Sequence, residues 1–167
     1  NSGIDLVEAQ ENVVMTRTFS KIYGLGGIRL GWAYCQELVA DVLNRVRGPF
    51  NVNSIAQAAG IAAIQDIAHT TQVYDHNKKW RAWTTTRLRE FDLSVIDSIG
   101  NFILCGFDTS NGKDAESAND FLKQRGILVR RMVGYGLPNH LRVTIGTQAE
   151  MTSFIDTIAQ LLEKGKT

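Results

Sequence analysis

The sequence contains little cysteine, little proline and no long apolar run, and each shortage excludes a class of protein. Its two cysteines, Cys35 and Cys105, are too few for a disulfide scaffold, and both lie in apolar stretches where a free thiol packs as a small hydrophobic side chain. With only 2 prolines and 15 glycines, the composition is neither collagen-like nor disordered. No apolar run approaches the length of a membrane-spanning helix. We therefore expect a folded protein in a reducing, cytoplasmic environment.

An excess of charge of one sign is also missing. Lys and Arg together number 18 and Asp and Glu 17, which gives a net charge of +1. This balance provides no general attraction to nucleic acid or to an anionic membrane, so recognition must depend on local groups. The three histidines, His69, His76 and His140, have no cysteine or carboxylate at ligand spacing, and no metal site is expected.

The first part of the chain predicts two strands that flank a glycine-rich loop. Apolar residues from Val13 to Met15, leading to Phe19, predict a short buried strand, and residues 29–35 predict a second one. The three glycines within residues 20–27 predict the loop. Two helices are expected next, one from Leu38 to the Gly48-Pro49 pair and one over residues 55–64 with Ser54 as its N-cap.

The rest of the chain predicts a long polar helix followed by an α+β unit. The polar helix is expected within residues 67–92, and it separates a first domain, 1–66, from a second, 93–167. Within the second domain we predict four strands, at 93–96, 102–107, 127–130 and 141–145, with a loop at 109–113 and a turn at 134–139. Two helices are also predicted. The first has Ala118, Phe121 and Leu122 facing inward, and the last has an apolar stripe from Met151 to Leu162.

The glycine-rich loop carries the strongest chemical signal of the sequence. The string TFSKIYGLGGIRLGW, residues 18–32, places a hydroxyl and a lysine at a strand end, then glycines that expose backbone amides, then Arg29. Hydroxyl, amides and guanidinium suit a phosphate group, and an amine beside a bound anionic cofactor suits a Schiff base with a carbonyl group. A dinucleotide G-x-G-x-x-G would need glycine at position 29, and a P-loop would need lysine directly after the final glycine, so neither fits. The simpler interpretation makes Lys21 and Arg29 solvated surface residues.

This string resembles the cofactor-lysine segment of class I/II pyridoxal-phosphate aminotransferases, S-K-x-x-G-L-x-G-x-R-x-G. The resemblance implies an α/β fold of the aspartate aminotransferase type (fold type I), with part of the large domain in residues 1–66 and an α+β small domain in residues 93–167. It implies that Lys21 links covalently to pyridoxal 5'-phosphate and serves as general acid and base, and that Ser20 and Arg29 hold the cofactor phosphate.

A second string, GYGLPNHLRVTIGT at residues 134–147, is similar to the small-domain signature of histidinol-phosphate aminotransferases. By this resemblance Arg142 pairs with the substrate α-carboxylate, and the activity is amino transfer from histidinol phosphate to 2-oxoglutarate in histidine biosynthesis. The resemblance further implies a C-terminal portion of a longer, homodimeric enzyme that acts on small amino and keto acids. Two alternatives stay open: an aromatic or other amino-acid aminotransferase, and a non-catalytic module. Arg17, Arg130 and Arg131 could face an anionic substrate, but surface roles are expected for them.

Overall fold

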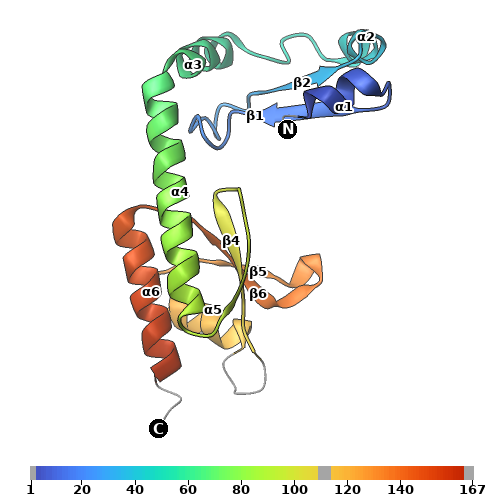
Figure 1. Cartoon of the computed structure of the whole chain (residues 1–167). Helices are drawn as coiled ribbons and strands as arrows, with labels where there is room; N and C mark the ends of the chain where they lie inside the picture. Colours follow the sequence, from blue (N-terminus) through green and yellow to red (C-terminus); the bar gives the residue numbers. More distant parts are fainter. Residues whose placement is uncertain (1–2, 109–113, 164–167) are drawn as a thin grey trace. The chain divides into compact units, whose positions relative to one another are not determined.

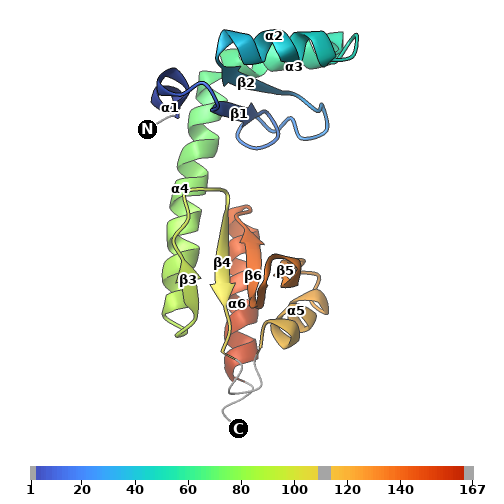
Figure 2. The same cartoon turned by 90° about the vertical axis from the view of Figure 1, so that its right-hand side faces the viewer.

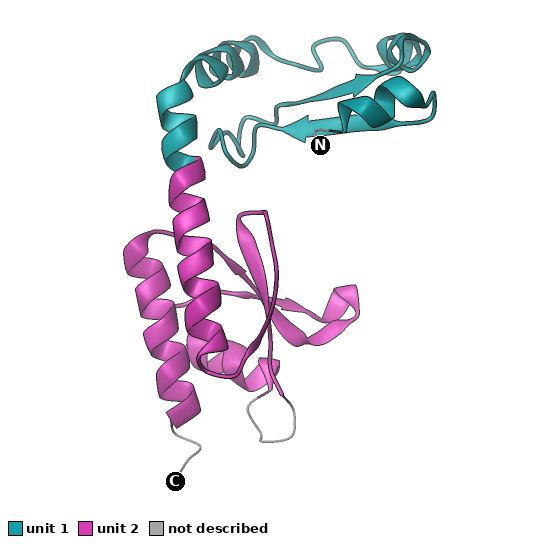
Figure 3. Cartoon of the chain, viewed as in Figure 1, with its two compact units in different colours: residues 1–73 teal, residues 74–167 magenta. Residues whose placement is uncertain are grey.

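A computed structural model of the chain describes residues 3–108 and 114–163 (Figure 1). It divides into two compact units, residues 1–73 (unit 1) and 74–167 (unit 2) (Figure 3). Unit 1 contains α1 (Ile4–Ala9), β1 (Val14–Thr18), β2 (Gly31–Cys35), α2 (Glu37–Val46), α3 (Ser54–Gln65) and the start of α4 (Ile67–Arg89). Unit 2 contains the rest of α4, then β3 (Ser94–Ile96), β4 (Phe102–Gly106), α5 (Ala115–Lys123), β5 (Arg130–Met132), the 3-10 turn η1 (Val133–Tyr135), β6 (Leu137–Thr144) and α6 (Gln148–Glu163).

The two strands of unit 1 form an antiparallel hairpin, with Val14 opposite Cys35 and Thr18 opposite Gly31. Both predicted strands are confirmed. The prediction that the first strand is buried is wrong, because within the described residues it pairs only with β2, and Val14 is 43% exposed. Gly31 is required where the strands meet, since a Cβ atom there would lie 2.8 Å from the carbonyl oxygen of Arg17.

Helices α2 and α3 follow the predicted pattern with one correction, and α1 was not predicted. The N-cap of α3 is Asn53, whose Oδ1 accepts a hydrogen bond of 2.8 Å from the amide of Ala56, and the predicted cap Ser54 is the first helical residue. Asparagine is as effective a cap as serine, and it is one residue better placed to reach that amide. Gly60 on α3 lies so close to Leu30 that a Cβ atom would approach its Cδ2 to 2.5 Å. The small residues of α3 therefore permit the close packing that the sequence predicts.

Unit 2 is built on a four-stranded antiparallel sheet in the order β3-β4-β6-β5 (Figure 2). Its core joins apolar residues of the sheet to those of three helices. The buried members include Leu88 of α4, Ile103 and Cys105 of β4, Ala118 and Leu122 of α5, Leu141 and Val143 of β6, and Phe154, Ile155 and Ile158 of α6. Because α4, α5 and α6 all contribute to this core, they cover one face of the sheet.

Two boundaries in unit 2 differ from the prediction. Residues 127–129 are not a strand, and β5 begins only at Arg130; Leu137, expected in a turn, already belongs to β6. The pairing of β5 with β6 shifts register between Arg131 and Met132, so it is short and irregular. The predicted loop at 109–113 lies outside the described residues. The other predicted helices and strands of unit 2 are confirmed as α4, β3, β4, α5, β6 and α6.

The long helix α4 contributes to both units. Its first turns belong to unit 1, and from position 74 onward it belongs to unit 2, where Trp80, Thr84 and Leu88 are buried. It ends at Arg89, and three residues later Asp92 adopts a left-handed conformation with φ of 60°. None of the described helices is both long and apolar enough to span a membrane. Nor do the described residues gather three or more metal-ligating side chains in one place.

Candidate active site

The glycine-rich loop of unit 1 takes its shape from backbone hydrogen bonds. At its base the amide of Phe19 donates to the carbonyl of Leu30 over 3.1 Å, and the amide of Leu25 donates to the carbonyl of Phe19 over 2.9 Å. A tight turn follows the lysine, with the amide of Gly24 donating to the carbonyl of Lys21 over 2.9 Å. Gly24 has a φ of +69°, a conformation that glycine adopts without strain. The loop is thus held from within, with Phe19 buried beneath it.

Two hydroxyl groups lie together where β1 runs into this loop. Thr18 Oγ1 accepts a hydrogen bond of 3.0 Å from the amide of Ser20 and donates one of 2.9 Å to Ser20 Oγ. Because the Ser20 oxygen accepts from Thr18, its own hydrogen is left to donate elsewhere. Ser20 is therefore oriented as a donor to an external acceptor such as a phosphate oxygen.

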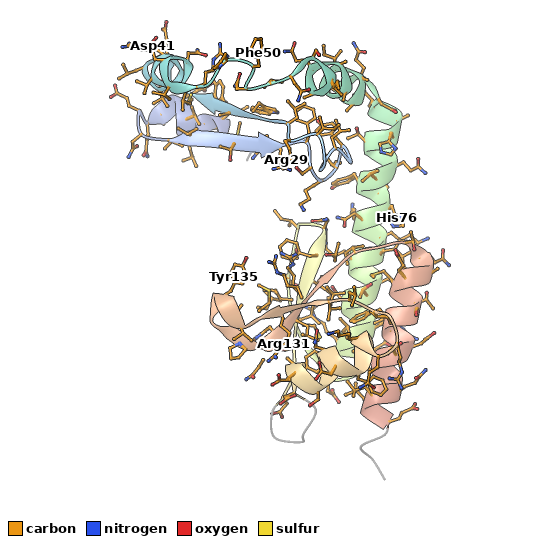
Figure 4. The ribbon with its side chains drawn as sticks, turned by 180° about the vertical axis from the view of Figure 1, so that it is seen from behind. Arg29, Asp41, Phe50, His76, Arg131 and Tyr135 are labelled. Atoms are coloured by element: carbon orange, nitrogen blue, oxygen red, sulfur yellow. The ribbon has the colours of Figure 1, made fainter. Side chains whose placement is uncertain are left out.

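The loop also presents two cationic side chains without acidic partners. The side chain of Lys21 is exposed, and its Nζ makes no hydrogen bond or ion pair with any residue that the structure describes. Arg29, labelled in Figure 4, has a φ of 59°, an uncommon value for a residue with a side chain, and its Nη1 donates to the carbonyl of Gly26 over 2.7 Å. Strained conformations of this kind cluster at functional sites. Amine, guanidinium and hydroxyl, all carried by this one loop, are groups that can bind an anion.

Arg142 lies on β6 in unit 2, on the face of the sheet opposite the core. Along this strand Leu141 and Val143 are buried, so the alternation of a strand places Arg142 on the other face. Its guanidinium carbon lies 5.1 Å from the centre of the Phe102 ring. No carboxylate of the described residues pairs with it, and its Nε is buried without a hydrogen-bond partner.

A second arginine stands directly opposite Arg142. The register of β5 and β6 pairs Arg130 with Arg142, and the guanidinium carbon of Arg130 lies 6.0 Å from the centre of the Tyr135 ring. The next residue, Arg131, instead forms an ion pair of 2.7 Å with Glu116 on α5 (Figure 4 labels Arg131 and Tyr135). Two arginines opposite each other in the ladder, neither with an acidic partner among the described residues, favour an anion with several oxygen atoms.

The structure gathers three of the four predicted site residues in one loop. Ser20, Lys21 and Arg29 belong to unit 1, and Arg142 belongs to unit 2. Sequence reasoning did not assign site roles to Thr18 or to Arg130. The hydroxyl of Thr18 was visible as part of the string 18–32. Arg130 could be recognised only from the strand register, because nothing in the sequence shows which residue faces Arg142.

Comparison with protein families places this loop and this strand in a known class. The family model described as "Aminotransferase class I and II" matches residues 1–158. The chain belongs to this family. Among its curated relatives are the histidinol-phosphate aminotransferases of Paramagnetospirillum magneticum, 55% identical over 150 residues, and of Rhodospirillum centenum, 51% identical over 161 residues. These alignments cover 90% and 96% of this chain but 41% and 44% of the relatives.

Solved structures show the same fold. The histidinol-phosphate aminotransferase of Sinorhizobium meliloti, solved with pyridoxal-5'-phosphate, matches with a TM-score of 0.82 and 25% identity over 92% of this chain and 42% of its own. The corresponding enzyme of Clostridium acetobutylicum matches with a TM-score of 0.88 and 21% identity over 96% of this chain and 49% of its own. The predicted fold class, part of the fold type I architecture, is confirmed. The chain spans less than half the length of each of these relatives.

Proposed function

We propose that this chain forms part of a pyridoxal-phosphate-dependent aminotransferase that transfers the amino group of histidinol phosphate to 2-oxoglutarate. The observation that carries the proposal is the amine of Lys21, which has no partner among the described residues and shares a loop with Ser20 and Arg29. The curated relatives support the choice of substrate, because those at 51–55% identity are all histidinol-phosphate aminotransferases.

The loop residues fit the phosphate of such a cofactor. Ser20 has a hydroxyl hydrogen to donate, and the Arg29 guanidinium retains donors beyond the one that Gly26 accepts. The amide of Gly27 donates to no described residue, so it can serve a phosphate oxygen as well. When bound, pyridoxal phosphate accepts the electron pair released at the substrate carbon. Ser20 and Arg29 fix its position.

Lys21 has two roles in this proposal. Its Nζ is the covalent anchor for the cofactor carbonyl carbon, a role that requires an amine without a competing ion pair. Once freed by the amino donor, the same Nζ would take the proton from the substrate α-carbon as general base and would then give it back as general acid to complete the amino transfer.

Arg142 and Arg130 are proposed to bind the charged ends of the two substrates. A guanidinium binds a carboxylate through two parallel hydrogen bonds, which suits the α-carboxylate of glutamate or 2-oxoglutarate. Histidinol phosphate carries no carboxylate, and its phosphate is the group that two arginines on opposite positions of the ladder favour. One pair of arginines can thus serve both halves of the reaction.

The lysine assignment is tested by trapping. The chain is mixed with pyridoxal phosphate, reduced with borohydride and digested, and the modified lysines are identified by mass spectrometry. We expect Lys21 to be labelled preferentially, and Ser20→Ala and Arg29→Gln to reduce its share. Lys123→Ala, at an exposed lysine of α5, is the matched control and should change nothing. Labelling of Lys21 no greater than that of other exposed lysines would refute the assignment.

The substrate assignment is tested by binding and turnover. Calorimetric titration of the chain with histidinol phosphate should show weaker binding for Arg142→Gln and for Arg130→Gln than for the unaltered chain. Arg45→Gln, on exposed helix α2, is the control. Amino transfer from histidinol phosphate is measured against transfer from aromatic amino acids. Preference for an aromatic donor would favour the alternative hypothesis, an aromatic amino-acid aminotransferase.

The same resemblance supports two further proposals about the whole enzyme. One is a homodimeric assembly, which sedimentation analysis can test. The other is a cytoplasmic location, which agrees with the two free cysteines, Cys35 and Cys105. The division into a large-domain part at residues 1–66, a connector at 67–92 and a small domain at 93–167 also stays a proposal.

A further inference from the structure

Arg142 is held by an aromatic ring and by no acidic group of the described residues. Phe102 on β4 faces Thr144 across the ladder, and Leu104 faces Arg142. Phe102 is therefore the diagonal neighbour of Arg142 on the same face of the sheet, a position from which a long side chain reaches an aromatic ring. The distance of 5.1 Å between the guanidinium carbon and the ring centre is within the range of a cation–π interaction.

Phe102 is itself fixed, because the turn that precedes it is bound to α4. The carbonyl of Gly100 accepts hydrogen bonds from Asn77 Nδ2 over 3.2 Å and from Arg81 Nη1 over 2.8 Å. The carbonyl of Asn101 accepts from the amide of Ile145 over 2.9 Å. The backbone on the N-terminal side of the ring is thus tied both to a helix and to the strand end beyond Arg142.

An aromatic partner differs from an acidic one in what it leaves available. A carboxylate would occupy the N–H groups of the guanidinium, and it would compete with an incoming carboxylate or phosphate. A ring face attracts the cation while forming no N–H···O bond. The Nη groups of Arg142 therefore have no competing acceptor among the described residues, even though the position of the side chain is restricted.

We propose that Phe102 is a positioning residue for Arg142, whose ring holds the guanidinium ready for an anionic substrate group. The proposal rests on the substrate-binding role given to Arg142 under the proposed function. Arg81 contributes indirectly, because it donates a hydrogen bond to the carbonyl of Gly100 in the turn that precedes Phe102. The ligand class is a carboxylate or phosphate on a small molecule.

The first test needs no ligand and no cofactor. In the NMR spectrum of the full chain, the ring current of Phe102 should shift the side-chain signals of Arg142 upfield. Phe102→Leu should return these signals to ordinary positions, and Phe102→Tyr, which keeps a ring, should leave them shifted. Ordinary Arg142 signals in the unaltered chain would overturn the proposal, and so would signals that are the same in the Leu variant. If the Leu variant does not fold, the Arg142 signals of the unaltered chain and of the Tyr variant still test whether the ring lies against the guanidinium.

The second test measures affinity, with glutarate as the dicarboxylate probe. Phe102→Leu should weaken glutarate binding about three- to tenfold, which is the range of a partly exposed cation–π contact, and Phe102→Tyr should bind as the unaltered chain does. The matched control is Phe121→Leu on α5, where Arg125 lies 3.4 Å from the ring centre in a similar stack on the core side of the sheet. It should bind glutarate normally.

The two tests separate the two ideas. Equal affinity of the unaltered chain and Phe102→Leu would overturn the positioning role. Loss of glutarate binding in every protein, the unaltered chain included, would count against the substrate role of Arg142, and the NMR comparison would then decide the role of Phe102 by itself.

Discussion

The two units support their candidate site residues in different ways. In unit 2, Ile103, Leu141 and Phe154 are almost completely buried in one core, and the strand that carries Arg142 passes through it. In unit 1, the described residues bury few large side chains, and Leu38 and Phe50 are 74% and 90% exposed. The loop around Lys21 instead keeps its shape through local backbone hydrogen bonds. The shape of the loop around Lys21 can therefore be specified locally, whereas the placement of Arg142 depends on a complete core.

The largest difference that we expect between the units is in the cost of truncating an apolar side chain. Phe154→Ala in unit 2 should lower the free energy of unfolding by about 3–5 kcal/mol, because it leaves a cavity in the core. Leu38→Ala in unit 1 should change it by about 0.5 kcal/mol or less, because the side chain is already in water. Urea unfolding is followed by tryptophan fluorescence, with Trp80 and Trp83 reporting on unit 2 and Trp32 reporting on unit 1. Equal costs would show that the face of α2 carrying Leu38 is covered in solution.

The two cysteines provide the next test. Cys105 lies in the core of unit 2, and burial raises the pKa of its thiol to about 12, so almost none of it is thiolate at neutral pH. Cys35 in unit 1 is only half-buried. In the native chain a thiol reagent should modify Cys35 at least about a hundredfold faster than it modifies Cys105. Mass spectrometry of timed samples shows the order, and urea should abolish the difference. Similar native rates would mean that the core of unit 2 opens readily.

A smaller effect is expected at the start of α3 in unit 1. Asn53→Ala removes the acceptor for the Ala56 amide and should cost about 1 kcal/mol. Hydrogen exchange at Ala56 should then be about fivefold faster. Ser54→Ala is the matched control and should have little effect, because Ser54 follows the cap. Equal acceleration by the two substitutions would contradict the assignment of Asn53 as the cap.

The smallest effect concerns pH and distinguishes the caps of unit 2 from that of unit 1. Hydrogen bonds from Ser117 hold the pKa of Asp114 below its usual value, and those from Thr147 do the same for Glu150. Because the folded-state pKa is the lower one, each carboxylate stabilises unit 2 above its unfolded pKa of about 4, and the contribution is lost as the pH falls through the folded value. Asp114→Asn should make stability less dependent on pH in acid, as measured by thermal melts between about pH 2 and 6. An unchanged acid profile would contradict the role of Asp114.

The sequence predicted those parts of the fold whose pattern is local. The stripe from Met151 to Leu162 indicates α6 because a helix needs only its own periodicity to be recognised. The exposure of β1 and the start of β5 at Arg130 were not predicted, because burial and edge pairing are decided by neighbouring segments that a local pattern does not contain.

The candidate site divides in the same way. Ser20, Lys21 and Arg29 lie within one short string, so their proximity follows from the sequence. The pairing of Arg130 with Arg142 and the diagonal position of Phe102 arise from strand register, which depends on how the chain returns to the sheet. For this reason Arg142 was recognised by resemblance alone, and its neighbours were not.

The pairing of Arg130 with Arg142 has a consequence for how these positions can change. Like charges directly opposite each other destabilise a ladder, so each arginine lowers the stability of the empty sheet. A neutral residue at either position should raise the free energy of unfolding and lower the affinity for anions. Under the proposed function, selection for stability and selection for anion binding act in opposite directions at this one pair, so engineering for heat resistance should leave the pair unaltered.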